Sequence, residues 1–171
     1  ALNASYVIRL TGDCPLVDAD LIDKVAHEVQ RGSIDYASNI EPPTYPNGLD
    51  VEAFTLAALT QAWHEAILPS EREHVTPFLR KQPNRFRHAN VTGLADLSAL
   101  RWTVDYPDDL EYVQSLLATA QVERATGFDR FDLYRAIERN PSLGNQPNHQ
   151  RNEGYRKSLL SEHPLDTGSN P

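Results

Sequence analysis

The sequence predicts an α/β protein with a parallel or mixed sheet and helices on both faces. Two short apolar segments, "YVIRL" at 6–10 and "RWTV" at 101–104, have the composition of buried strands. Each is followed by an acid and then by a segment with helical spacing of apolar residues. Further strand and helix candidates alternate along the chain, without internal repeats. Such alternation is typical of this fold class.

Three more segments are predicted to be strands. Residues around Tyr36–Ser38 and the segment "RFRHANVTG" at 85–93 are short strand candidates. The segment "LDVEAF" at 49–54 alternates apolar and polar residues, as a half-exposed strand does. The pair Asn47-Gly48 just before it is typical of a tight hairpin turn. We therefore expect an inserted β-hairpin that leaves the main sheet.

Five segments are predicted to be helices, and they lie at 18–29, 55–67, 70–82, 107–121 and 129–141. In the second helix Thr55 is a candidate N-cap. Helical spacing predicts that its core-facing residues are Leu56, Leu59, Trp63 and Ile67. In the third helix Ser70 and Glu73 match the S-x-x-E capping box, and Pro77 must end or kink the helix. Pro107 and the two acids after it favour a helix start.

Size and composition indicate one globular domain. The chain has 171 residues, of which 40% are hydrophobic and 23% are charged, close to the average for soluble proteins. We expect this domain over residues 1–160 and a disordered tail over 161–171, where Asn, Gly and Pro are frequent. Because the first strand candidate begins a few residues after Ala1, we expect the chain to be the later portion of a longer protein.

The same numbers argue against several classes of partner. A net charge of −8 without any Lys/Arg block argues against nucleic-acid binding. No apolar run approaches the roughly 18 residues of a membrane span. The one cysteine, Cys14, rules out an internal disulfide and is expected to be a small buried residue. With no secretory leader visible, we expect a cytoplasmic protein.

Two acids follow the two most apolar strand candidates. Asp13 comes after Gly12 in "RLTGDCPLVD", and Asp105 ends "RWTVD". If the two strands are parallel neighbours, both carboxylates emerge at the same edge of the sheet, where ligands of open α/β sheets bind. Carboxylates that meet there need a cation, and Mg²⁺ with its oxygen ligands is the natural one. The alternative is that each aspartate only caps or turns the chain.

Five segments in a fixed order carry a resemblance to a known family. They are "RLTGDCPLVD", "YPNGLDVEAF", "SEREHVTPF", "RWTVDYPDDLEYV" and "RNEGYRKSL". Together they resemble the cytidylyltransferase family of the spore-coat polysaccharide biosynthesis type, which is related to the enzymes that activate 3-deoxy-manno-octulosonate and acylneuraminate. The resemblance implies a Rossmann-like nucleotide-diphospho-sugar transferase fold. It also implies the formation of a CMP-sugar and pyrophosphate from CTP and a sugar.

The resemblance also assigns roles to residues. Asp13 and Asp105 match the metal-binding aspartates of the related synthetases, so they are the predicted catalytic residues and Mg²⁺ ligands. The predicted substrate-binding residues are Asn47, Asp50, Glu52, Arg72, Glu73 and His74. Asp50 is expected to bind sugar hydroxyls, and Arg72 and His74 a carboxylate or phosphate. The alternatives are solvated acids at a turn and a salt-bridged helix start. Residues 151–155, "RNEGY", are expected to serve packing.

The chain departs from the family at its start. Members begin with a strand and a loop rich in Arg, Gly and Ser, and this chain has neither that loop nor any other Gly-rich phosphate loop. The N-terminal nucleotide-binding part is therefore expected to be missing. Two other functions stay open: a glycosyltransferase, because "GLDVE" contains D-x-E, and a non-catalytic docking module. The resemblance also implies a homodimer formed through the hairpin.

Overall fold

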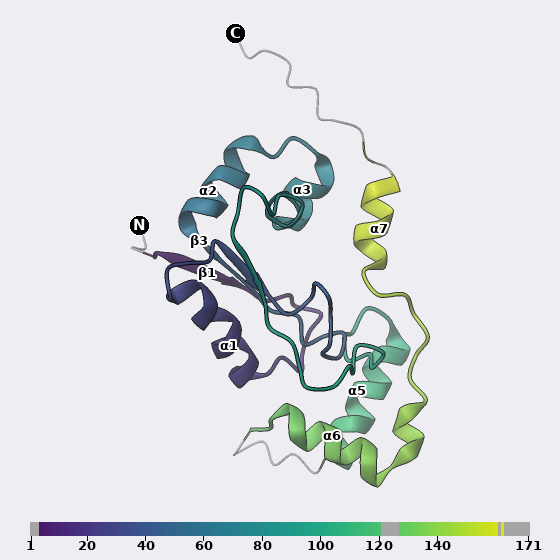
Figure 1. Cartoon of the computed structure of the whole chain (residues 1–171). Helices are drawn as coiled ribbons and strands as arrows, with labels where there is room; N and C mark the ends of the chain where they lie inside the picture. The colour runs from purple at the N-terminus through teal and green to yellow at the C-terminus, as the bar shows by residue number, and fades with distance from the viewer. Residues whose placement is uncertain (1–3, 121–126, 161, 163–171) are drawn as a thin grey trace.

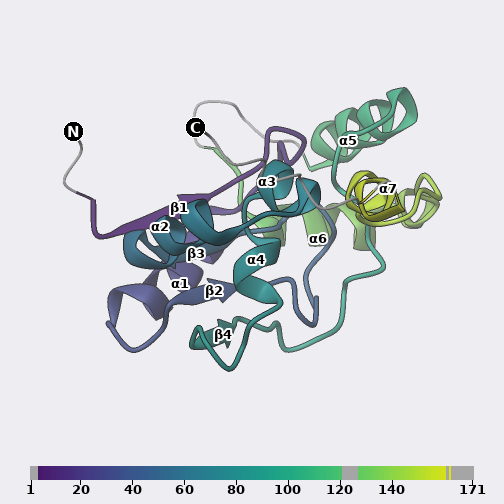
Figure 2. The ribbon, with the colours of Figure 1, turned by 90° about the horizontal axis from the view of Figure 1, so that it is seen from above.

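The computed structural model describes residues 4–120, 127–160 and 162. Its four strands form one mixed sheet in the order β1-β3-β2-β4. The strands are β1 (Tyr6–Arg9), β2 (Tyr36–Ser38), β3 (Glu52–Thr55) and β4 (His88–Asn90). β3 pairs antiparallel with β1 and β2, and β2 pairs parallel with β4. Figure 2 shows the strands in this order, with the helices α5, α6 and α7 gathered beyond one end of the sheet.

Helices cover both faces of this sheet, as the sequence predicts (Figure 1). The described helices are α1 (Ala19–Gln30), α2 (Leu56–Glu65), α3 (Pro69–His74), α4 (Pro77–Arg80), α5 (Pro107–Thr119), α6 (Arg130–Arg139), the 3-10 turn η1 (Pro141–Gly144) and α7 (Glu153–Leu160). Ala37 and Ala53 face the core that contains α1, α5 and α6. Tyr36 and Phe54, their neighbours in sequence, face a second core with α2 and α4. Successive strand residues point to opposite faces, so each strand contributes to both cores.

The predicted strand at 101–104 is wrong. This segment lies outside the sheet and forms only an isolated bridge between Arg101 and Asn47. Trp102 is nevertheless fully buried. Gly48 permits the close approach, because its φ is +107° and a Cβ there would lie 2.5 Å from the Trp102 carbonyl carbon. Extended, buried backbone resembles a strand in sequence even where it makes no ladder.

The hairpin prediction also differs from the structure. β2 and β3 are antiparallel neighbours inside the sheet, and residues 39–51 form the long connection between them. Asn47 and Gly48 turn within this connection, where Leu49 N–H donates to the Pro46 carbonyl. The connection is held by Asn39, which is buried and bonds both the Leu49 carbonyl and the Val51 N–H. Asn47-Gly48 is therefore a turn in a loop, and it is not the tip of a hairpin.

Two details of the predicted helices were wrong as well. In α2 the N-cap is Thr55, as predicted, but the buried residues are Ala58 and Ala62, and Trp63 is 66% exposed. Small alanines face the sheet because the helix lies close to it. In α3 the predicted capping box is absent: Leu68 is the N-cap, without a side-chain bond. The expected break at Pro77 is confirmed, since α4 begins there.

The C-terminal segment contains a helix that the sequence did not predict. α7 has no fully buried residue and lies against α3. The tail predicted to be disordered, 161–171, lies outside the described residues except for Glu162, which accepts a hydrogen bond from Ser70. Within the described residues, none of the helices combines the length and the hydropathy that crossing a bilayer requires.

Candidate functional site

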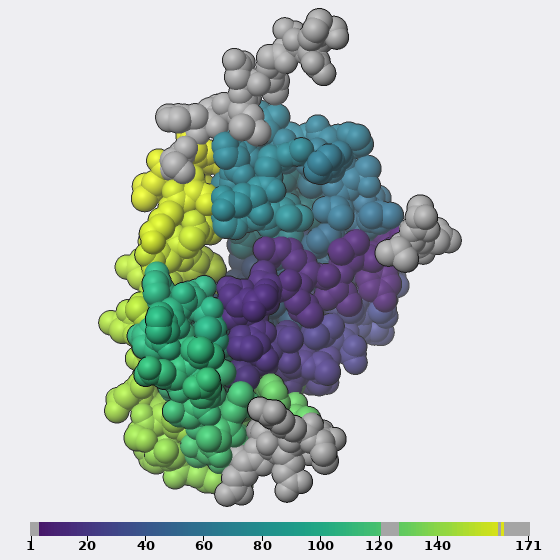
Figure 3. All heavy atoms as spheres, turned by 180° about the vertical axis from the view of Figure 1, so that it is seen from behind, coloured from purple at the N-terminus to yellow at the C-terminus, as the bar shows by residue number. Residues whose placement is uncertain are grey.

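A cavity of about 440 Å³, lined mostly by polar side chains, lies where the N-terminal segment, the segment before α5 and α7 meet. Figure 3 shows the molecule hollowed between the C-terminal helix, in yellow, and the N-terminal segment, in purple. Six residues predicted to be functional line this cavity: Asp13, Asn47, Asp50, Glu52, His74 and Asp105. Arg72 and Glu73 are not among its lining residues. These six residues come from four separate parts of the chain, and residues 150–157 add a fifth part to the lining.

Asp13 and Asp105 lie on two segments that are hydrogen-bonded to each other. The Val104 N–H donates to the Asp13 carbonyl over 2.8 Å, and the Thr103 hydroxyl donates to the same carbonyl over 3.0 Å. The Thr103 hydroxyl also lies 3.4 Å from an Asp13 carboxylate oxygen. The two aspartates are thus brought to one cavity although their segments are not parallel strands of a sheet.

A buried arginine holds one of these aspartates. Arg101 Nη2 donates to Asp105 Oδ2 over 2.8 Å, while its Nε and Nη2 both donate to Asp109, each over 2.7 Å. Asp109 also accepts the backbone N–H groups of Asp105 and Tyr106. Burial opposes the charge of Asp109, but these hydrogen bonds outweigh it and lower the pKa of the carboxyl below its ordinary value.

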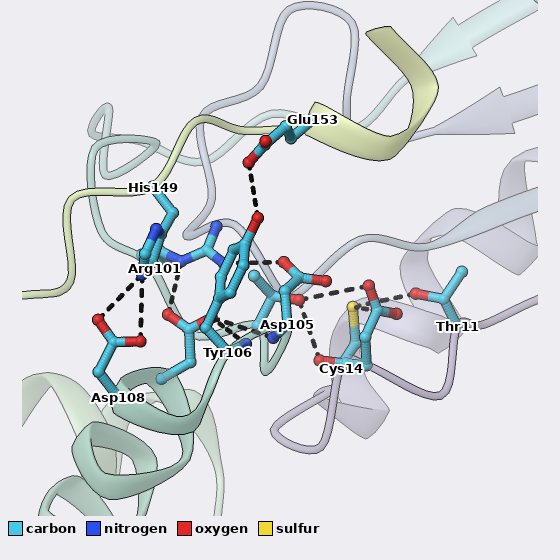
Figure 4. Close-up of polar contacts among 11 residues, drawn as sticks. Thr11, Cys14, Arg101, Asp105, Tyr106, Asp108, His149 and Glu153 are labelled. Atoms are coloured by element: carbon cyan, nitrogen blue, oxygen red, sulfur yellow. Dashed lines mark hydrogen bonds and ion pairs between the residues drawn. The ribbon is translucent and has the colours of Figure 1, made fainter. Parts of the chain in front are cut away.

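Residues next to Asp105 connect the start of α5 to the C-terminal segment (Figure 4). The Tyr106 hydroxyl donates to Glu153 over 2.8 Å, and the Tyr106 ring stacks on His149 at a centroid distance of 4.1 Å. His149 in turn bonds Asp108. The hydrogen bond to Glu153 raises the pKa of the Tyr106 hydroxyl. These contacts place α7 over one side of the cavity.

One cluster of three metal-binding side chains occurs among the described residues. Asp108, Asp109 and His149 have ligand atoms within 4.8 Å of one another. Asp109, however, already accepts four N–H groups, two of them from Arg101. A carboxylate that is bound to a guanidinium and capped by backbone N–H groups is a poor cation ligand. The three side chains therefore lie close together because Asp108 and Asp109 lie in the first turn of α5 and His149 stacks on Tyr106, and not because they form a metal site.

The acids predicted to bind substrate have partners of their own. Asp50 is half-buried, and Arg151 Nη2 donates to it over 2.6 Å. Burial raises the pKa of Asp50 above its ordinary value, against the opposing charge of Arg151. Glu52 is buried and accepts bonds from Arg9, over 2.6 Å, and from the Tyr36 hydroxyl, over 2.5 Å. Both acids line the cavity, and Glu52 is fully engaged within the fold.

The remaining predicted residues divide into two groups. Asn47 and His74 line the cavity, and His74 Nε2 lies 2.9 Å from the Ser158 hydroxyl of α7. Arg72 instead stacks over the Trp63 ring at 4.3 Å and donates to the Trp63 carbonyl. Glu73 is exposed and accepts a bond from Ser158. Neighbours in the segment 72–74 thus point in different directions, as expected for one turn of helix.

Several lining residues could not be found from the sequence. Arg80 lines the cavity and lies over the Tyr155 ring at 5.5 Å. Its Nε is buried and has no hydrogen-bond partner in the described part of the chain. The motif "RNEGY" at 151–155, expected to serve packing, supplies Asn152, Glu153 and Tyr155 to the cavity lining, and Lys157 follows from the same helix. The one hint in the sequence was that "RNEGYRKSL" is among the five segments that carry the family resemblance.

Cys14, beside Asp13, is buried as expected. Its thiol lies 3.1 Å from the Thr11 hydroxyl. Burial raises the pKa of the thiol to about 12. A thiol that stays protonated is neither a nucleophile nor a metal ligand.

Comparisons with known proteins match this geometry to a family. The model of the cytidylyltransferase family matches residues 1–135. The chain belongs to the cytidylyltransferase family. A solved cytidylyltransferase from Leptospira borgpetersenii has the same fold, with a TM-score of 0.77 and 31% identity, over 86% of this chain and 62% of that one.

The chain is also similar to two curated proteins. The spore coat polysaccharide biosynthesis protein SpsF of Bacillus subtilis is 30% identical over 85% of this chain and 60% of its own length. An uncharacterized protein of Methanocaldococcus jannaschii is 28% identical over 91% of this chain and 62% of its own. This cytidylyltransferase-family chain therefore spans about three fifths of the length of the curated relatives it matches.

Proposed function

We propose that the chain forms part of a Mg²⁺-dependent cytidylyltransferase that makes a CMP-sugar for surface polysaccharide biosynthesis. In this reaction a sugar oxygen attacks the α-phosphate of CTP in line, and pyrophosphate leaves. The observation that carries the proposal is the joining of the Asp13 and Asp105 segments at one cavity by the bond from Val104 N–H to the Asp13 carbonyl. The family assignment and the likeness to SpsF support the same reaction.

The residues at the cavity fit a magnesium ion. Asp13 and Asp105 both offer carboxylate oxygens, the ligands that Mg²⁺ prefers, and both line the cavity. Asp105 Oδ2 is engaged by Arg101, while Oδ1 receives no hydrogen bond from the described residues. A magnesium ion bound there supplies charge stabilisation for the departing pyrophosphate. Side chains contact both carboxylates: the Thr103 hydroxyl lies near that of Asp13, and Arg101 donates to that of Asp105.

The rest of the cavity fits a sugar. Its lining combines acceptors such as Asp50 with donors such as His74, Arg80 and Lys157. Hydroxyl groups both donate and accept, so a sugar needs donors and acceptors mixed in this way. In this proposal Asn47 and Asp50 bind hydroxyls from one side of the cavity, and residues of α7 bind them from the other. Glu52, already paired with Arg9 and Tyr36, shapes the wall.

The nucleotide base and triphosphate need residues that this chain does not supply. It has no Gly-rich phosphate loop, and it spans only 60–62% of its curated relatives. β1 is an edge strand whose outer side is unpaired among the described residues, and its Ile8 is exposed. We therefore include in the proposal a segment preceding β1 that carries the nucleotide-binding loop.

The test is a pyrophosphate-release assay on the protein translated from its complete reading frame. CTP, Mg²⁺ and a panel of free sugars are supplied without an acceptor glycan, so glycosyl transfer cannot produce the signal. We expect pyrophosphate with one or more sugars, and a loss of at least a hundredfold in Asp13→Asn and Asp105→Asn, about the effect of removing a group that stabilises transition-state charge. Pyrophosphate release that is unaffected by either substitution would contradict the proposal. Calorimetric titration with CTP and Mg²⁺ tests the alternative: the absence of binding heat would favour a docking module.

A further inference from the structure

Arg101 is a buried charged side chain behind the cavity wall, and it bonds two acids, of which Asp105 lines the cavity. Its side chain is 6% exposed, that of Asp109 is 1% exposed and that of Asp105 is 44% exposed. We call these three residues the Arg101 trio. Nε and Nη2 fix the guanidinium on the buried side by two bonds to Asp109, and the same Nη2 also donates to the half-exposed Asp105. Figure 4 shows the Asp105 carboxylate between Arg101 and the Thr11–Cys14 segment.

We propose that Arg101 is a positioning residue that orients Asp105 for a divalent cation. This inference rests on the proposed function. The bond to Oδ2 fixes the carboxylate in one rotamer and leaves Oδ1 free to face the cavity. An exposed aspartate without such a partner samples several rotamers, so binding a cation would first have to order it. Arg101 orders the Asp105 side chain when the chain folds, so the cation does not have to order it on binding.

Because Arg101 is positively charged, the inference can be tested by whether a substitution of Arg101 raises or lowers the affinity for the cation. A guanidinium that contacts a cation ligand repels the cation, so electrostatics alone predicts that Arg101 weakens cation binding. Positioning predicts the opposite, because the carboxylate is ordered in advance. Arg101→Lys keeps the charge but loses the planar fork that bonds two carboxylates at once. A loss of affinity in this variant therefore reports the geometry and not the charge.

The chain contains a matched control for this variant. Arg130 is also 6% exposed, and it bonds the buried Asp18 over 2.5 Å and the exposed Asp20 over 2.7 Å. We call these residues the Arg130 trio. None of its members lines the cavity. Arg130→Lys should therefore disturb the fold about as much as Arg101→Lys does, while leaving the cavity residues in place.

The experiment titrates the 171-residue chain with Mn²⁺, a paramagnetic substitute for Mg²⁺, and follows free Mn²⁺ by electron paramagnetic resonance. For the wild type we expect one site that Asp13→Asn or Asp105→Asn abolishes. Arg101→Lys should weaken it about three- to tenfold, the cost of ordering one side chain at a binding site. Arg130→Lys should stay within about twofold of the wild type.

Three outcomes separate the inference from the proposed function. If the wild type binds no Mn²⁺, or if neither aspartate substitution changes Mn²⁺ binding, both the proposed metal site and the inference about Arg101 are overturned. If the site is present but Arg101→Lys binds Mn²⁺ equally well or more tightly, only the role of Arg101 is overturned. Equal weakening by Arg130→Lys also overturns it, because the effect is then general loss of structure.

A measurement on the unmodified chain covers the case in which Arg101→Lys fails to fold. Three-bond NMR couplings report the χ1 rotamers of aspartates without any metal. We expect Asp105 to occupy a single rotamer although it is 44% exposed, and the exposed Asp23 of α1, for which the described structure gives no ion pair, to average over several. Rotamer averaging at Asp105 would overturn the inference whether or not the chain binds a metal.

Discussion

The Arg101 trio and the Arg130 trio are the same arrangement in two regions of the molecule. In each, a buried arginine bonds one fully buried aspartate at a helix start and one exposed aspartate nearby. They differ in what the arginine joins. Arg101 and Asp109 are eight residues apart, whereas Arg130 and Asp18 are separated by 112 residues and connect α6 to α1.

The third member of each trio shows the consequence. Asp105 lines the cavity, while Asp20 lies on the surface of α1 and is shared with Lys24. A long-range pair ties helices together, and a short-range pair fixes the shape of one segment. The same chemistry thus serves tertiary structure in one place and, in our proposal, the geometry of a binding site in the other. The predictions below test how far this likeness extends, in order of expected effect.

The largest effect should come from removing the buried aspartates. Asp109→Ala and Asp18→Ala each leave a buried arginine with only its exposed partner, and breaking a buried ion pair in this way costs about 3–5 kcal/mol. Urea unfolding at neutral pH measures the free energy of unfolding for both. We expect losses of similar size, because the burial and the number of bonds are similar. If one variant lost less than about 1 kcal/mol, the two trios would not be equivalent in the fold.

The next effect tests a device that only the Arg101 trio has. Gly48→Ala places a Cβ 2.5 Å from the backbone of Trp102 and Thr103, next to Arg101, and its φ of +107° adds strain. We expect the free energy of unfolding to fall by about 2–4 kcal/mol, the sum of left-handed strain and overpacking. Gly32→Ala is the control: its φ is +78°, with nothing within 4 Å of the added Cβ. The free energy of unfolding of Gly32→Ala should fall by only about 1 kcal/mol. Equal losses in the two variants would mean that the close approach is not a constraint.

A smaller effect separates the two exposed aspartates. Mg²⁺ at about ten times its dissociation constant should stabilise the wild type by about 1.4 kcal/mol, because only the folded chain binds it. Differential scanning fluorimetry with and without Mg²⁺ measures the shift. Asp20→Asn should keep the shift, and Asp105→Asn should lose it. A shift that survives in Asp105→Asn would place the cation elsewhere.

The sequence predicted neither trio as a unit, for a physical reason. It identified Asp105 as a site residue, and Pro107 marked the start of α5 correctly, but Arg101 lies in extended backbone before that helix, where spacing along the chain does not reveal a partner. The pairing of Arg130 with Asp18 depends on how α6 packs on α1, and no local pattern encodes a contact across 112 residues. The cavity shows the same limit. Asp13 and Asp105 were expected at the ends of parallel strands, but both line the cavity because Val104 and Thr103 bond the Asp13 carbonyl.

Missed elements follow a similar rule. α7 was overlooked because its sequence is mostly polar. Its Ser158 hydroxyl and Tyr155 ring both contact His74 of α3, and its Glu153 accepts a bond from Tyr106. Hydrophobic periodicity detects helices that bury an apolar face, and α7 buries none. The inward face of α2 was predicted only in part: Leu59 packs against the second core, but Ala58 and Ala62 are the buried residues, and Leu56, Trp63 and Ile67 are exposed. Both errors concern packing partners, which the sequence of one segment does not contain.

The smallest expected effect is the pH dependence of Asp20, the exposed member of the Arg130 trio. Hydrogen bonds from Lys24 and Arg130 lower the pKa of this carboxyl below its ordinary value of 3.8. A lowered pKa means that the charged carboxylate stabilises the folded state above the unfolded pKa, and that this contribution is lost as the pH falls through the folded pKa. Because the side chain is 55% exposed, solvent screening limits it to less than about 1 kcal/mol.

Urea unfolding of the wild type and Asp20→Asn at pH 6 and pH 3 measures this contribution. The difference between the two proteins should be present at pH 6 and should shrink at pH 3, where the carboxylate begins to be protonated in the unfolded chain first. High salt at pH 6 should reduce the same difference, because an exposed pair is screened. A difference independent of both pH and salt would mean that Asp20 acts through packing, and the Arg130 trio would then reduce to its single buried pair, Arg130 with Asp18.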